Sequence, residues 1–150
     1  MSIIIREANF EDFDELYTIG SNTPEFRVSA NEPFMEKDEF KGRIESKNNI
    51  FLLAEKDDKL AGFIVVGLDN TDSPIINKYA CIIYIVVIPE FRGEGIAQKL
   101  YLEAEKRTKE AGMTHVYIWA NSEGKGEIVQ FFKKNGLAKG HKYIWMDKKI

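Results

Sequence analysis

The stretch of sequence that decides the fold reads Ile85-Val86-Val87-Ile88-Pro89-Glu90-Phe91-Arg92-Gly93-Glu94-Gly95-Ile96-Ala97-Gln98. It begins in an uncharged, β-branched run over residues 79–88 and ends in an amphipathic pattern over residues 95–111. A run of the first kind predicts a buried central strand, and apolar spacing of the second kind predicts a helix. We therefore interpret the stretch as a strand, a glycine turn and a helix N-terminus.

A glycine turn at a helix N-terminus is a geometry that attracts phosphate, because the first helical N–H groups have no partner within the helix. Gly93 and Gly95 lack a Cβ atom, so they allow positive φ and a close approach of an anion, and Arg92 can add charge-assisted hydrogen bonds. A purely structural glycine turn is the alternative. The sequence lacks the P-loop pattern, and Gln98 stands where a dinucleotide fingerprint needs a small residue.

The remaining pattern predicts a mixed α/β chain. Strands are expected at residues 3–6, 50–55, 60–66 and 115–119, and terminal strands are expected around Tyr143, Ile144 and Trp145. Helices are expected near residues 10–17, 37–47 and 126–134, with an N-cap at Asn9 and a C-cap at Gly112. No linker or repeat interrupts the order, so we expect one domain over residues 1–150.

Composition limits the class of protein. The 150 residues are 44% hydrophobic and carry a net charge of -3, which suits one buried core and gives no basic surface for a nucleic-acid partner. The lone Cys81 cannot form an internal disulfide and fits a reducing compartment. We see no signal peptide, and the longest apolar run falls short of the roughly 20 residues that span a bilayer. These features favour a soluble cytoplasmic protein without a membrane partner.

Two motifs carry a resemblance to a known family. Residues 87–97 fit V-x-P-x-x-[RQ]-x-x-G-x-[GA] at every fixed position, and residues 131–137 (Phe-Phe-Lys-Lys-Asn-Gly-Leu) resemble a later motif of an aromatic pair followed by x-K-x-G. With these motifs, the chain resembles the GNAT superfamily of N-acetyltransferases. Element order and length agree over nearly the whole chain.

The resemblance implies a GNAT fold: a mixed, mostly antiparallel central sheet with helices on both faces, and two parallel strands that splay apart at an acetyl-CoA site. Backbone groups of Ile85, Val86 and Val87 would pair with the pantetheine arm. The pyrophosphate would lie at the turn formed by Arg92, Gly93, Glu94, Gly95, Ile96, Ala97 and Gln98. The acetyl group would pass directly to a primary amine of a small molecule or a protein, with no metal, and a backbone N–H near Val87 would stabilise the oxyanion.

The chain departs from the family pattern where catalytic groups are expected. Phe132 stands where many members have a tyrosine that protonates the leaving thiolate, and Lys125 replaces a frequent asparagine. Residues 79–88 and 115–120 contain no acid that could act as the general base. Tyr84, in the strand next to the cofactor, is our candidate catalytic acid, and plain strand packing is the alternative.

Other candidate residues have ordinary structural explanations. His141 and Tyr143 could line the acceptor cleft, and ordinary surface or packing roles are the alternative. His115 begins a strand and has no evident partner in the sequence, which favours a structural role. Glu123 and Glu127 suit helix capping. Cys81 suits a small buried hydrophobe better than an acyl-carrying nucleophile, because nothing nearby would lower its pKa. Residues 21–36 suit either a rim over a polar acceptor or a solvated loop.

Two other functions stay open at this point. One is a non-catalytic sensor that binds acetyl-CoA or another acyl-CoA, suggested by Phe132 and the acid-poor strands. The other is a nucleotide-binding module that uses the glycine turn for a different phosphate. For the assembly, the exposed edges of the final strands could pair in a homodimer.

Overall fold

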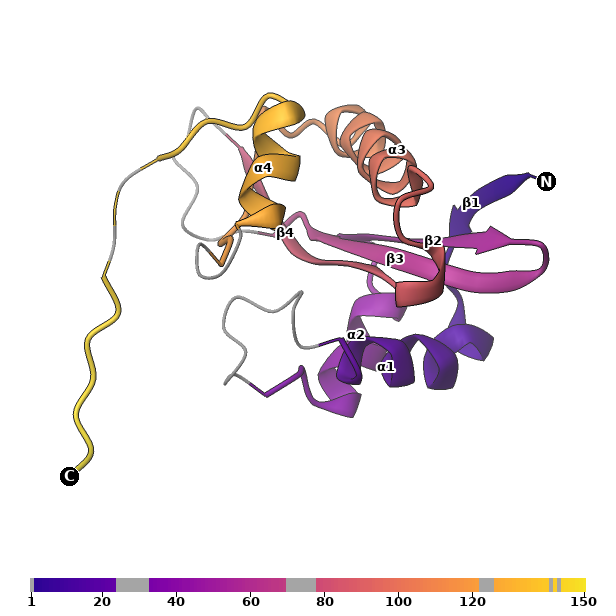
Figure 1. Ribbon diagram of the computed structural model, residues 1–150, viewed down its shortest axis with the longest axis horizontal. Helices are drawn as coiled ribbons and strands as arrows, with labels where there is room; N and C mark the ends of the chain where they lie inside the picture. Colours follow the sequence, from indigo (N-terminus) through magenta and orange to yellow (C-terminus); the bar gives the residue numbers. More distant parts are fainter. Residues whose placement is uncertain (1, 24–32, 70–77, 122–125, 141, 143) are drawn as a thin grey trace.

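A five-stranded sheet organises the chain, in the order β1-β2-β3-β4-β5 (Figure 1). This computed structural model describes residues 2–23, 33–69, 78–121, 126–140, 142 and 144–150. The strands are β1 (Ile3–Glu7), β2 (Asn49–Lys56), β3 (Lys59–Gly67), β4 (Tyr79–Val87) and β5 (His115–Tyr117). The first three pairings are antiparallel and β4 runs parallel to β5. The predicted mixed, mostly antiparallel sheet is confirmed.

Helices cover both faces of the sheet, as Figure 1 shows: α1 and α2 lie on one side, α3 and α4 on the other. A short 3-10 turn, η1 (Phe10–Asp12), leads into α1 (Phe13–Ser21), and α2 spans Lys37–Glu45. The later helices are α3 (Ile96–Glu110) and α4 (Glu127–Lys134). Two predicted caps are confirmed, since the Asn9 side chain accepts from Glu11 N at the start of η1 and Gly112 follows α3 with φ of 88°.

Each face of the sheet has its own apolar core. On the α3 side, Leu100, Tyr101 and Phe132 pack against inward-facing strand residues. On the α1 side, the fully buried Phe40 is the centre of an aromatic cluster whose other members are Phe13, Tyr17, Phe34, Phe51 and Phe63, with ring centroids 5.3–6.0 Å from that of Phe40. Aromatic rings at these separations stabilise each other beyond their burial.

An ion-pair network ties the entry of α1 to the sheet. Arg6 of β1 donates to both carboxylate oxygens of Asp12 at 2.8 Å and to Glu55 of β2 at 2.6 Å. The hydrogen bond from Arg6 is the main reason that the pKa of Asp12 lies below its ordinary value. Asp12 also accepts from Asn9 N and so completes the capping box of η1.

A β-bulge interrupts the pairing of β3 with β4. Val65 lies opposite Tyr84 and Val66 lies opposite Ile82, which leaves Ile83 as an extra residue in β4. Before the bulge Ile82 faces α3, and after it Ile85 faces the same side. Between them, Ile83 and Tyr84 both pack on the α1 side. The bulge therefore turns two consecutive side chains toward α1 and α2.

The end of the chain differs from the prediction. The terminal strand predicted at Ile144 and Trp145 is wrong, because residues 144–150 form no strand in the structure, and Tyr143 lies outside the described residues. A strand needs a neighbouring strand to satisfy its backbone, and this segment has none within the described part of the single chain. β5 also ends at Tyr117, two residues earlier than predicted. No helix in the described ranges has the length and apolar character needed to cross a membrane.

Candidate functional site

The site begins where β4 and β5 separate. The two strands pair only from Tyr79 to Cys81 in β4 and from His115 to Tyr117 in β5, whereas β4 continues to Val87. Within the described residues, the second half of β4 therefore has a strand neighbour on the β3 side alone. This open edge is the splay that the resemblance predicted.

Backbone groups of β4 face the splay at alternate residues. Ile88 N donates to Ala61 O of β3 at 2.9 Å, so the residue before it turns its N–H and C=O to the other edge. By the same alternation Val87 and Ile85 face the splay, while Val86 lies opposite Phe63 and faces β3. Arg92 Nε donates to Val87 O at 3.0 Å and fixes the following turn against the strand.

The glycine turn has the conformation expected from the sequence. Gly93 has φ of 82° and Gly95, the N-cap of α3, has φ of 80°. Lys99 N makes the first helical hydrogen bond, to Gly95 O at 3.1 Å, so the amides of residues 96–98 precede it at the open end of the helix. A Cβ atom built on either glycine meets no atom within 4 Å. Glycine is therefore favoured here by φ, and the space above the turn is open to an anion.

Two contacts at this turn were missed by sequence reasoning. Lys56, at the end of β2, forms an ion pair with Glu94, and its Nζ lies 5.8 Å from the centroid of the Phe91 ring. Gln98 and Asn135 exchange two side-chain hydrogen bonds, of 2.6 and 2.9 Å, which join the first turn of α3 to the end of α4. Lys56 precedes the turn by 38 residues, and no local pattern links the two.

Tyr84 lies on the opposite side of the sheet from α3, among residues of the α1–α2 connection. Met35 N donates to Tyr84 Oη at 3.3 Å, and the Phe34 ring centroid lies 4.8 Å from that of Tyr84. Tyr17 Oη donates to Met35 O at 2.7 Å, so both tyrosine hydroxyls hold the same backbone residue. Phe34 also covers Gly20, where a Cβ atom would lie 2.3 Å from the ring.

Phe132 is a core residue of α4. It is 3% exposed and packs edge-on against Tyr101 and Phe131, with centroid distances of 5.7 and 5.0 Å. Burial, followed by the hydrogen bond with Glu105, raises the pKa of Tyr101. Tyr101 is 2% exposed and its hydroxyl bonds to Glu105 of the same helix, so its ring belongs to the core between α3 and α4.

The other candidate residues have structural surroundings. His115 stacks on Tyr79 with the ring planes 4° apart, and its Nδ1 lies 2.8 Å from Thr114 Oγ1. Burial is the largest influence on the pKa of Cys81 and raises it, as expected for a small hydrophobe. The prediction that nothing nearby would lower this pKa is wrong, because the Tyr117 hydrogen bond and the Arg43 charge both act in that direction. Glu127 lies in the first turn of α4. Outside the described residues are His141, Tyr143, Glu123, Lys125 and residues 24–32 of the expected acceptor rim.

A cavity of about 530 Å³ lies between α1, the β2–β3 turn and the residues Ile88 and Glu90, which follow the end of β4. Its lining includes Asp14, Glu15 and Asp58 but none of the splay-facing residues of β4. Among the residues that the structure describes, no three His, Cys, Asp or Glu side chains gather as a metal site requires.

Comparison with known proteins decides the family. The profile described as "Acetyltransferase (GNAT) family" matches residues 10–137, which is most of the chain. The chain belongs to the GNAT acetyltransferase family. The match includes β4, the glycine turn, α3 and α4, and the predicted resemblance is confirmed.

Two curated proteins are similar in sequence. An uncharacterised N-acetyltransferase of Methanocaldococcus jannaschii is 31% identical over 65% of this chain and 43% of its own length. A putative [ribosomal protein bS18]-alanine N-acetyltransferase of Bacillus subtilis is 26% identical over 71% of this chain and 62% of its own length. The matches thus span less than two thirds of either relative.

Solved structures share the fold. The aminoglycoside N-acetyltransferase AAC(6′)-Iy, in complex with the bisubstrate analogue CoA-S-monomethyl-acetylneamine, superposes with a TM-score of 0.76. The superposition covers the whole of both chains at 15% identity. The aminoglycoside N-acetyltransferase in that structure is bound to a CoA conjugate. Because only 15% of the residues are identical, its similarity to this chain shows a common fold and nothing about the ligand of this chain.

Proposed function

We propose that this protein is an acetyl-CoA-dependent N-acetyltransferase that transfers an acetyl group directly to a primary amine. One observation carries the proposal: the open edge of β4 leads straight into a turn with two glycines at positive φ and the free N-terminus of α3. An extended, hydrogen-bonding arm followed by a pyrophosphate fits this combination. Acetyl-CoA has both parts, and it supplies the activated thioester.

The residues proposed to hold the cosubstrate follow from that combination. Backbone groups of Ile85 and Val87 face the splay and suit the pantetheine amides. Val86 lies between them, but its backbone pairs with Phe63 of β3, so it would position Ile85 and Val87 without bonding to the arm itself. Amides of residues 93–98 suit the pyrophosphate, and Arg92 braces the turn by its bond to Val87 O.

Tyr84 is the proposed catalytic acid that returns a proton to the departing thiolate. The Tyr84 hydroxyl accepts a hydrogen bond from Met35 N, and a phenol is chemically able to donate a proton as well as to accept one. The alternative, that Tyr84 only packs against Phe34, is tested by Tyr84→Phe with Tyr17→Phe as the matched control. Both variants remove a hydroxyl that binds Met35, so a fall in kcat in the first alone supports catalysis, and equal effects would indicate a structural role.

The acceptor is proposed to be a primary amine of a small molecule or of a protein. The relatives support both kinds, since one is named for an alanine of a ribosomal protein and the other for aminoglycosides. The lone cysteine supports a reducing compartment such as the cytoplasm. We expect residues 1–150 to act as one N-acetyltransferase domain.

Calorimetric titration with acetyl-CoA, free CoA, ATP and NAD tests the cosubstrate. Binding of both CoA species with a Kd near 1 μM, or about -8 kcal/mol, and no competition by ATP or NAD would support the proposal. Binding of ATP or NAD in place of acetyl-CoA would refute it and favour the nucleotide-binding alternative.

A non-catalytic acyl-CoA sensor remains the second candidate, because Phe132 is buried among aromatic rings and offers no proton. Release of free CoA thiol in the presence of a panel of amines, from amino sugars to an alanine-initiated peptide, separates the two functions. Tight binding without release from any amine would favour the sensor.

A further inference from the structure

The ring of Phe34 rests on a glycine of α1, which we name its seat. A Cβ atom built on Gly20 would lie 2.3, 2.7 and 2.9 Å from the ring atoms Cζ, Cε1 and Cε2 of Phe34. Gly20 is buried in the last turn of α1 and does not have positive φ. The close approach of the ring, and not the backbone conformation, therefore requires glycine at this position.

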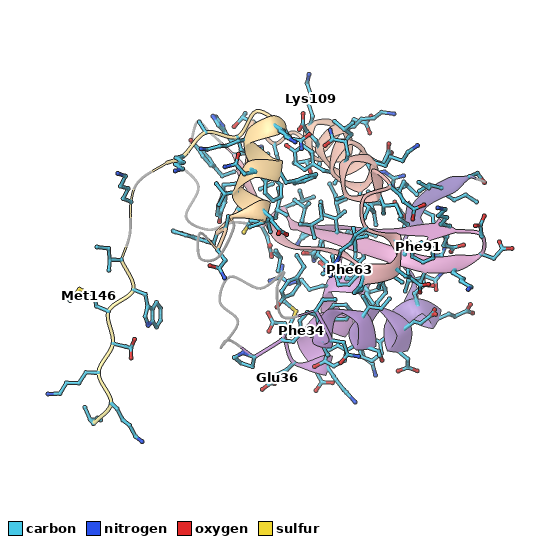
Figure 2. All side chains as sticks on the ribbon, viewed as in Figure 1. Phe34, Glu36, Phe63, Phe91, Lys109 and Met146 are labelled. Atoms are coloured by element: carbon cyan, nitrogen blue, oxygen red, sulfur yellow. The ribbon has the colours of Figure 1, made fainter. Side chains whose placement is uncertain are left out.

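Three further rings hold Phe34 from different elements. Its centroid lies 5.3 Å from that of Tyr17 on α1, 5.5 Å from that of Phe40 on α2 and 4.8 Å from that of Tyr84 on β4. Figure 2 shows Phe34 and Phe63 together on the side of the sheet that α1 and α2 cover. Because the ring is enclosed in this way, it cannot give way to a Cβ atom at its seat without moving one of these neighbours.

The backbone of Met35 follows Phe34 directly, so the position of the ring also fixes the Met35 N–H. This N–H donates to Tyr84 Oη at 3.3 Å, at the weak end of the hydrogen-bonding range, so a small displacement of Met35 breaks the bond. An N–H directed at a phenol oxygen stabilises the negative charge that remains on the oxygen when its proton leaves. The Met35 N–H therefore links the position of Phe34 to the ability of Tyr84 to give up a proton.

We infer that Phe34, in its seat on Gly20, is a positioning residue for proton transfer by Tyr84: it holds the phenol ring and directs the Met35 N–H at the phenol oxygen. The inference rests on the proposed acetyltransferase function with Tyr84 as its acid. Tyr17 binds Met35 through the carbonyl oxygen and packs on Phe34 through its ring. Tyr17→Phe keeps that ring, so the seat of Phe34 is retained in this variant.

Gly20→Ala tests the inference, with Gly42→Ala as the matched control. Both glycines lie within helices, where alanine is the better helix former, but a Cβ atom on Gly42 meets no atom within 4 Å. In the thiol-release assay, Gly20→Ala should lower kcat at least about tenfold, because a misplacement of about 1 Å can cost about 100-fold. The KM for acetyl-CoA should stay within about twofold, because the residues assigned to the cosubstrate are unchanged. Gly42→Ala should match the wild type in both constants.

A double-variant cycle separates positioning from packing. If Phe34 acts through Tyr84, then Gly20→Ala should change kcat by less than about twofold when Tyr84→Phe is already present. Hydrogen exchange gives a readout that needs no turnover: the Met35 amide should exchange at least about tenfold faster in Gly20→Ala than in Gly42→Ala. Phe34→Leu removes the ring without a clash at Gly20. It carries the same expectations and replaces Gly20→Ala if urea unfolding shows that this variant does not fold.

The outcomes distinguish a failure of this inference from a failure of the proposed function. Equal kcat values in Gly20→Ala and Gly42→Ala, or equal exchange rates of the Met35 amide, would overturn the inference and leave acetyl transfer intact. So would a loss in Gly20→Ala that multiplies in full with the loss in Tyr84→Phe, or a Tyr84→Phe variant as active as the wild type. A wild type that releases no thiol with any amine would refute the proposed function, and the inference with it.

Discussion

Gly95 and Gly112 stand at the two ends of α3 and allow a controlled test of the glycine turn. Both have positive φ, 80° and 88°, and a Cβ atom at either position meets no atom within 4 Å. Alanine therefore adds backbone strain without a steric clash in the free protein. A non-glycine residue in the left-handed region costs roughly 1–2 kcal/mol, so Gly95→Ala and Gly112→Ala should lower the free energy of unfolding by similar amounts.

The two variants should separate when CoA is present. At a CoA concentration of 100 times the wild-type Kd, binding adds about 2.7 kcal/mol to the free energy of unfolding. Gly112→Ala should regain this amount in full. The methyl group of Gly95→Ala is added within the run of amides that we assign to the pyrophosphate. If the affinity then falls about 100-fold, the same CoA concentration adds only about 0.4 kcal/mol to the free energy of unfolding.

Urea unfolding followed by circular dichroism, with and without CoA, measures both quantities. The midpoint gives the strain in the absence of ligand, and its shift with CoA gives the binding contribution. Equal CoA-dependent shifts in Gly95→Ala and Gly112→Ala would refute the assignment of the turn. If the CoA-dependent shift of the urea midpoint is also reduced in Gly112→Ala, strain at either end of α3 weakens binding. The amides at the start of α3 would then have no specific role in binding CoA.

Three further predictions concern charge and packing. Lys56→Met should raise the Kd for CoA by up to about fivefold in calorimetry, because the ion pair that neutralises Glu94 at an anion site is worth up to about 1 kcal/mol. Adding Glu94→Gln to Lys56→Met removes the uncompensated negative charge and should restore the affinity. A double variant that binds as weakly as Lys56→Met would contradict this. Asp12→Asn should lower the free energy of unfolding by about 1–2 kcal/mol at pH 7. The pKa of Asp12 in the folded protein lies below the unfolded value of 3.8. The stabilisation that its carboxylate gives is therefore complete above pH 3.8 and is lost as the pH falls through the folded pKa, so the urea midpoints of Asp12→Asn and the wild type should converge in acid. A difference between the midpoints that stays constant with pH would argue against the pKa shift. Phe40→Ala should lower the free energy of unfolding, measured in urea, by about 3–5 kcal/mol. Phe10→Ala, at a residue that is 53% exposed, should lower it by less than about 0.5 kcal/mol. Comparable losses in the two variants would disprove the central place of Phe40 in the aromatic cluster.

Local chemistry explains which parts of the structure the sequence could predict. An uncharged, β-branched run at residues 79–88 specifies a strand, and helical spacing of apolar residues after Gly95 specifies a helix. Two glycines between the strand and the helix indicate a turn with positive φ, as found at Gly93 and Gly95. The family resemblance followed from this stretch together with the motif at residues 131–137. These predictions need no knowledge of distant contacts.

Features that depend on contacts between distant residues could not be predicted. Ile83 is one apolar residue among many, and the bulge at this position becomes visible only when β4 is paired with β3. Lys56 reaches Glu94 from another strand. Residues 144–146 have the composition of a strand, so the sequence predicted one, but composition does not say whether a neighbouring strand is present.

The bulge at Ile83 divides β4 into two halves whose inward positions are out of phase. Even-numbered residues face α3 in the first half and odd-numbered residues do so in the second. A saturation substitution scan of the strand should therefore show an alternating tolerance for polar residues that shifts by one position at Ile83. Deleting Ile83 would restore a regular strand in which Ile82 and Ile85 still face α3, because Tyr84 alone would then lie between them. The extra residue thus adds one apolar side chain to the α1 side of the sheet and leaves unchanged the set of β4 residues that face α3.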